Sequence, residues 1–142
     1  MHHLVYISDR NQGHAGDMEQ FLYDADYFHD SLHITGALWF NETEFIHMME
    51  GEAEDLEVVF KRITNSKSHK NVTLVHKEKC TKRFFDDWTM ASFGEQTYCG
   101  YIARQFGESN LFEPRSLPPE RLINLLYFLE ENRRHNLQQA IC

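Results

Sequence analysis

The chain has 142 residues, 42% of them hydrophobic and 13% aromatic, which favours a single globular domain with a well-formed core. Its formal net charge of -8 argues against nucleic acid or an anionic membrane as the main partner, because both reward a basic face. No apolar run is long enough for a membrane span, no signal-peptide pattern is present, and the cysteines lack CxxC spacing. We therefore expect a cytoplasmic protein in a reducing compartment.

The N-terminal part of the chain predicts a strand, a loop and a helix. Residues 3–8 are rich in β-branched and aromatic side chains, which predicts a strand. The period of two along this strand places Tyr6 and Ser8 on one face. Residues 9–16 are polar and contain two glycines, which indicates a loop. In residues 17–30 the apolar side chains recur at helical spacing, so an amphipathic helix is expected there.

A hairpin is predicted over residues 34–51, where two apolar, aromatic-rich runs flank the polar link 41–43. The second run contains an unusual residue, His47. Alternation along the strand places this imidazole on the same face as Phe45 and Met49. One face of the hairpin therefore combines apolar side chains with a titratable group.

A second helix is predicted from residue 51 to about residue 63, with an acidic first turn that suits the positive end of the helix dipole. Residues 72–76 predict a fourth strand in which His76 lies on the same face as Leu74. Residues 77–83 are mostly basic and predict an exposed connection. A fifth strand begins near Trp88.

This order of elements, βαββαβ plus one strand, predicts a ferredoxin-like α+β sandwich with two helices on one face of a mixed sheet. After Gly94 the composition changes, and residues 98–106 predict a short helix. A longer helix is expected to begin within residues 116–120, where a serine is followed by two prolines. A polar tail is expected over residues 130–139.

Several segments between about residues 3 and 94 resemble the BLUF domain, a blue-light sensor that uses FAD, in order and at near-family spacing. The segments are Leu4-Val5-Tyr6-Ile7-Ser8, Ile34-Thr35-Gly36-Ala37-Leu38, Phe45-x-x-x-Met49-Glu50-Gly51, Arg62-Ile63, His69-x-Asn71-Val72 and Arg83-x-Phe85-x-x-Trp88-x-Met90. The resemblance implies a flavin-binding domain over residues 1–95 with the ferredoxin-like fold. It also implies a C-terminal helical extension, residues 96–142, packed on the same domain as in short BLUF proteins.

The resemblance also implies a site, in which the flavin ring lies between the two core helices and over the sheet. Tyr6 matches the family's electron and proton donor, and Trp88 and Met90 match the segment that reports changes at the flavin to the outside. The implied cofactor-binding residues are Tyr6, His29, His47, Arg62, Ile63, His69 and Met90. The implied signalling residues are Tyr6, His47, Trp88 and Met90.

The chain departs from the family pattern at several positions of this site. The family's glutamine on the third strand is His47 here, and its asparagine at the end of the first helix is His29. The acidic and basic residues after the second helix are replaced by Ser66 and Ser68. A primary amide can exchange donor for acceptor by rotating, whereas neutral imidazole has one of each on a rigid ring. We therefore expect a photocycle that is altered or lost.

Other functions stay open at this stage. The protein is expected to signal through light-dependent association with a partner or with itself, through the C-terminal helices. The alternative is an interaction domain that has lost the flavin, or one whose histidines, His29, His33 and His47, bind a metal or haem. Tyr6 and His47 could also be ordinary core residues. No paired carboxylates, phosphate loop or Ser-His-Asp ordering is present, so no enzymatic activity is expected.

Overall fold

The computed structural model describes residues 1–11, 23–24, 27, 30–92, 98–106 and 113–135. Its strands are β1 (His2–Arg10), β2 (Thr35–Phe40), β3 (Glu44–Gly51), β4 (His69–Lys79) and β5 (Trp88–Ser92). Its helices are α2 (Ala53–Thr64), α3 (Tyr98–Phe106) and α4 (Pro119–His135). Most of the predicted first helix lies outside the described residues; the described positions 23–24, 27 and 30 within it are helical, as are residues 31–32 just beyond its predicted end.

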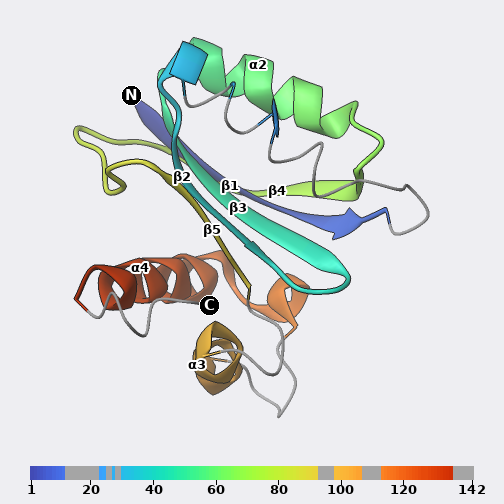
Figure 1. Cartoon of the computed structure of the whole chain (residues 1–142), viewed down its shortest axis with the longest axis vertical. Helices are drawn as coiled ribbons and strands as arrows, with labels where there is room; N and C mark the ends of the chain where they lie inside the picture. Colours follow the sequence, from blue (N-terminus) through green and yellow to red (C-terminus); the bar gives the residue numbers. More distant parts are fainter. Residues whose placement is uncertain (12–22, 25–26, 28–29, 93–97, 107–112, 136–142) are drawn as a thin grey trace.

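The strands form a single sheet in the order β4-β1-β3-β2-β5. β1 runs antiparallel to both β3 and β4, and β2 runs antiparallel to β3. β5 is added beside β2 in parallel orientation. Figure 1 shows α2 on one side of this sheet, with α3 and α4 on the other. The predicted ferredoxin-like α+β fold with an additional fifth strand is confirmed.

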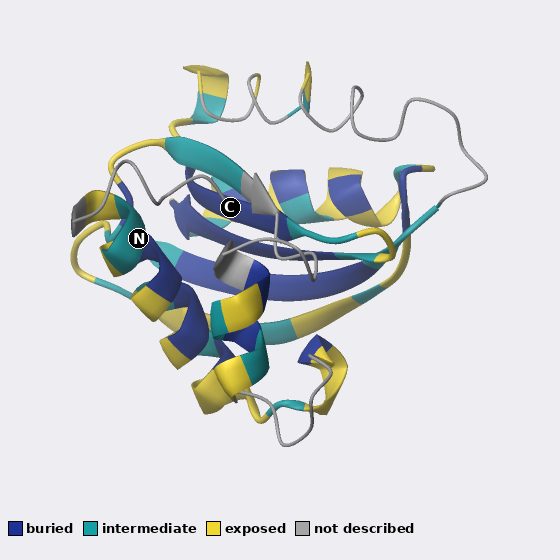
Figure 2. Ribbon diagram, turned by 60° about the horizontal axis from the view of Figure 1, so that its bottom comes forward, coloured by how far each residue is buried: buried dark blue, intermediate teal, exposed yellow. Residues whose placement is uncertain are grey.

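Apolar clusters on both faces of the sheet hold these layers together, and the central strands are buried from both sides (Figure 2). The cluster facing α2 consists of Leu4, Tyr6, Ile34, Met49, Leu56, Val59 and Ile63. The cluster facing α3 and α4 is larger and consists of Val5, Ile7, Ala37, Trp39, Ile46, Met48, Phe85, Ala103, Leu122, Leu125, Leu126 and Leu129. Alternate residues of each central strand therefore enter different cores, as the period of two requires.

The hairpin of β2 and β3 forms as predicted, with a link that Asn41 stabilises. The Asn41 side-chain oxygen accepts hydrogen bonds from the main-chain N–H of Thr43 (2.9 Å) and of Glu44 (2.7 Å). Gly36 has φ of +152°, and a Cβ placed there would lie 1.9 Å from the main-chain oxygen of Met48. Only glycine fits at this position of β2.

The edge strand β4 contains an irregularity that changes which side chains share a face. Tyr6 of β1 pairs with Leu74, whereas Val5 pairs with His76, so Val75 is an additional residue between the two pairs. Such a bulge shifts the alternation by one residue. The expectation that His76 shares a face with Leu74 was wrong, because His76 lies beside Val5 on the α4 side.

Two boundaries differ from those expected. β4 continues to Lys79, so the first part of the predicted basic connection is strand. The predicted polar tail continues α4 to His135, and within it Glu130 is buried and pairs with Arg133 at 2.7 Å. α4 begins at Pro119, inside the predicted range 116–120, after a 3-10 turn over Pro114–Ser116. None of the described helices combines the length and apolar character needed to cross a membrane.

Candidate functional site

A row of side chains crosses the α2 face of the sheet perpendicular to the strands. Tyr6 of β1 pairs with His47 of β3, which pairs with Leu38 of β2, which in turn pairs with Met90 of β5. Tyr6, His47 and Leu38 are fully or almost fully buried. Trp88 stands one row away, opposite Gly36. Four adjacent strands thus present one residue each to the same line on the sheet.

His47 is hydrogen-bonded through both ring nitrogens. Its Nδ1 lies 3.0 Å from the Tyr6 hydroxyl, and its Nε2 accepts a hydrogen bond of 3.0 Å from the indole N–H of Trp88. Because an indole nitrogen can only donate, Nε2 carries no proton. The single proton of the neutral ring therefore sits on Nδ1 and is donated to the Tyr6 oxygen. Trp88 thereby determines the tautomer of His47.

Burial keeps this pair uncharged. Removal from water, with a smaller contribution from nearby His69, lowers the pKa of His47 to about 3. Burial also raises the pKa of Tyr6 well above its ordinary value. A charged His47 would also point a second N–H at the Trp88 donor. The site at neutral pH therefore holds a neutral imidazole and a neutral phenol.

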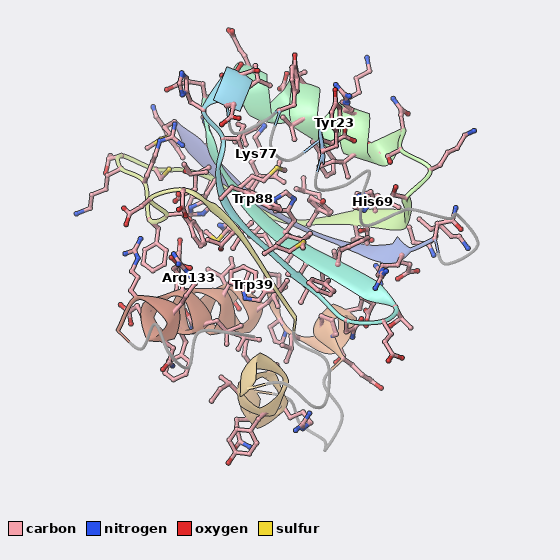
Figure 3. The ribbon with its side chains drawn as sticks, in the orientation of Figure 1. Tyr23, Trp39, His69, Lys77, Trp88 and Arg133 are labelled. Atoms are coloured by element: carbon pink, nitrogen blue, oxygen red, sulfur yellow. The ribbon has the colours of Figure 1, made fainter. Side chains whose placement is uncertain are left out.

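A second polar pair lies beside the first, toward the end of β1. The Ser8 hydroxyl is 2.8 Å from Nδ1 of His69, and both residues are buried. The ring centroid of His69 is 4.8 Å from that of Phe45 and 6.0 Å from that of Tyr6. Figure 3 shows His69 and Trp88 on the α2 side of the sheet, whereas Trp39 and Arg133 lie on the α4 side. The two hydrogen-bonded pairs therefore share one face.

The other predicted site residues lie farther from this row. Arg62, on the exposed side of α2, donates to Asp24 at 3.2 Å and lies over the ring of Tyr27 at 5.5 Å. Ile63 is buried in the cluster under α2. His29 lies outside the described residues, so the part of the prediction that depends on it stays open.

The structure adds contacts that the sequence pattern did not indicate. The bond from Trp88 to His47 crosses strand β2, and nothing in the spacing of these residues predicts it. Ser8 was placed on the Tyr6 face by its period, which is the signal that could have marked it. Ser68 has a buried side-chain oxygen with no hydrogen-bond partner among the described residues. This hydroxyl directly precedes His69.

Comparison with solved structures supports the assignment of the fold. The structure of BlsA in its photo-activated state matches with a TM-score of 0.76 and 27% identity, covering 88% of this chain and 91% of that one. The ground state of BlsA matches with a TM-score of 0.70 and 25% identity, covering 99% and 88%. BlrB, a BLUF protein in its dark state, has a TM-score of 0.73 and 22% identity, covering 89% and 92%. No curated protein matches the sequence.

This chain therefore combines a buried tyrosine–histidine row with a fold similar to those of BlsA and BlrB. The family model described as sensors of blue-light using FAD matches residues 1–91. The chain belongs to the BLUF family of photosensory domains.

The residues described on the α2 face fit a flavin. The Tyr6 oxygen accepts a hydrogen bond from His47, so the Tyr6 hydroxyl can donate its own proton to an acceptor on a ligand. Ser68, which precedes His69 in the chain, adds a buried oxygen without a hydrogen-bond partner among the described residues. Apolar side chains of α2, including Phe60 with its ring centroid 5.9 Å from that of Tyr6, supply the surroundings that a flat ring needs.

Proposed function

We propose that this protein binds FAD between α2 and the sheet and acts as a BLUF-type sensor whose switch differs from that of the family. The bound flavin would supply the absorption of blue light and the redox chemistry. Tyr6 would face it as the donor, His47 would stand in the place of the family's glutamine, and Arg62, Ile63, His69, Met90 and His29 would complete the site. The observation that carries the proposal is the buried hydrogen-bonded series Tyr6–His47–Trp88.

This series makes a glutamine-type switch unavailable. A glutamine can bond to the tyrosine and still direct either end of its amide at a ligand. His47 instead has Tyr6 on one nitrogen and Trp88 on the other, so neither nitrogen is left for the cofactor. Rotating the ring would break both bonds inside a buried site, at a cost of roughly 1 to 3 kcal/mol for each unsatisfied group. We therefore infer a flavin protein with an altered or absent photocycle.

The same observation favours a second function, a BLUF-like interaction domain that no longer holds a flavin. In that case the imidazole serves only to join β1, β3 and β5 by hydrogen bonds. A metal or haem site built from His29, His33 and His47 is less well supported, because His47 and His33 belong to no common cluster of metal ligands among the described residues.

Absorption spectroscopy separates these functions. The purified protein is mixed with excess FAD, freed from unbound flavin, and measured before and after blue illumination. A retained flavin spectrum supports the proposal, and we expect little or no red shift after illumination. Loss of all flavin during removal would contradict the proposal and favour the cofactor-free domain.

The variant His47→Gln tests whether His47 is the residue that limits the switch. We expect this variant to show a reversible red shift of the flavin spectrum in light, and the double variant His47→Gln, Tyr6→Phe to lose it. Trp88→Phe is the matched control, because it removes the indole N–H and leaves both Tyr6 and His47 in place. A flavin-loaded His47→Gln protein without a shift would refute this role of His47.

BLUF domains signal to attached effector domains or to separate partners, and we propose that this chain uses a partner or a second copy of itself in the cytoplasm. The α4 side is the candidate surface, because Phe128 and Tyr101 are exposed there. The proposal keeps residues 96–142 as an extension of the sensor domain and assigns no enzymatic activity to the chain. Light scattering in dark and light, with Phe128→Ser as the variant, measures whether this surface supports association.

A further inference from the structure

A cluster of possible metal ligands lies on the α4 side of the sheet, away from the proposed flavin site. His3 of β1 and Glu78 of β4 are paired directly across the two strands. His76 joins them because the bulge at Val75 turns it to the same side, and Lys77 between them pairs with Leu4 of the opposite face. His3, His76 and Glu78 each offer one ligand atom, and these atoms all lie within 4.8 Å of one another.

The two distances from the Glu78 carboxylate to the imidazoles match the spacing of ligands around a transition metal. Glu78 Oε2 lies 3.5 Å from His3 Nε2 and 3.2 Å from His76 Nε2. Ligands about 2.0 to 2.2 Å from a tetrahedral zinc ion are roughly 3.4 Å from one another. The imidazole rings of His3 and His76 have centroids 5.2 Å apart and are tilted by 34°.

His3 supplies an independent sign of a ligand. The residue is only 8% exposed, and among the described residues its buried Nε2 makes no hydrogen bond of good geometry, with the Glu78 carboxylate at 3.5 Å. Coordination to a metal ion would give this buried nitrogen the well-directed partner that it lacks. Burial and the neighbouring His76 lower the pKa of His3, which favours the neutral ring that a metal requires.

We propose that His3, His76 and Glu78 bind a divalent transition metal ion of the zinc class. Two imidazoles and one carboxylate suit zinc and its neighbours better than calcium or magnesium, which prefer oxygen ligands. The site has three protein ligands, and the partly exposed positions of His76 and Glu78 leave a side for water. It joins the edge strand β4 to the central strand β1.

Zinc binding to the untagged full chain tests this proposal by calorimetry with zinc chloride alone. We expect one ion per chain. Glu78→Gln and His76→Gln should each weaken binding by more than the roughly 10 to 100-fold that loss of an outer-shell partner costs. Both side chains are partly or largely exposed, so these variants are expected to fold. Bound zinc should also raise the melting temperature of the wild type and not of Glu78→Gln.

The adjacent imidazole provides a matched control. His2 lies next to His3 and points to the opposite face of β1, so His2→Gln should bind zinc as the wild type does. Cobalt titration adds a spectroscopic measurement, because a tetrahedral site gives strong visible bands that Glu78→Gln should abolish. No zinc binding in the wild type, or binding unchanged in both His76→Gln and Glu78→Gln, would overturn the proposal.

Discussion

The two faces of the sheet are built from the same strands and differ in chemistry. Behind α3 and α4, the core is a continuous set of aliphatic and aromatic side chains. Its buried carboxylate, Glu50, accepts from the main-chain N–H groups of Phe84 (2.7 Å) and Phe85 (2.9 Å). Beneath α2, imidazoles and hydroxyls are buried in pairs instead. The α2 face therefore buries polar side chains that bond to one another, whereas the buried carboxylate Glu50 on the other face bonds to the main chain.

The α4 face should respond most strongly to loss of volume. Leu125 is 1% exposed in the larger cluster, so Leu125→Ala removes several methyl and methylene groups and leaves a cavity. We expect the free energy of unfolding to fall by about 2 to 5 kcal/mol, measured by urea denaturation. The control is Val58→Ala on the exposed side of α2, where Val58 is 59% exposed and a change of less than about 0.5 kcal/mol is expected. Equal losses of unfolding free energy in Leu125→Ala and Val58→Ala would contradict the role given to burial in the larger cluster.

The α2 face should respond most strongly to pH. The pKa of His47 is about 3 in the folded protein, below the ordinary value of 6.5, so the unfolded state binds more protons between these limits. The resulting stability is fully present above about pH 6.5 and is lost as the pH falls toward 3. The loss approaches about 1.4 kcal/mol for each pH unit within this window.

His47→Gln isolates this contribution, since the variant has no imidazole to protonate. We expect the wild type to lose about 2 to 3 kcal/mol more than the variant between pH 7 and pH 4.5, measured by urea denaturation at both values. The subtraction cancels the carboxylates that titrate in both proteins. Parallel pH profiles would contradict this prediction, because they would show that the pKa of His47 is the same in the folded and unfolded states.

The smallest effect is expected outside both cores. Arg62 is half exposed and pairs with Asp24 at 3.2 Å, and exposed pairs of this kind contribute about 0 to 1 kcal/mol. We expect Arg62→Ala to change the free energy of unfolding by less than about 0.5 kcal/mol. Its effect on retained FAD should be larger if Arg62 turns toward the cofactor. A stability loss similar to that of Leu125→Ala would show that Arg62 has a structural role.

Much of this comparison could be predicted from the sequence because it depends on local periodicity. Alternation placed His47 with Phe45 and Met49, and Tyr6 with Ser8, and all of these side chains lie on the α2 side. The order of strands and helices was enough to predict the sheet. Such patterns need only the geometry of one strand or one helix.

The remaining features depend on relations between strands. The bond between Trp88 and His47 requires β5 to pair with β2 in one register, and no local pattern specifies that register. The position of His76 depends on an additional residue in β4, which appears only when the pairing with β1 is known.

The Nδ1 proton of His47 has a further consequence, for local dynamics. It is held between two buried rings and can reach water only when this part of the sheet opens. Its rate of exchange with deuterium therefore measures how often β3 separates from the layer above it. This single nitrogen-bound proton is visible in the downfield region of a proton NMR spectrum. Its exchange rate reports local opening of the α2 face of the sheet.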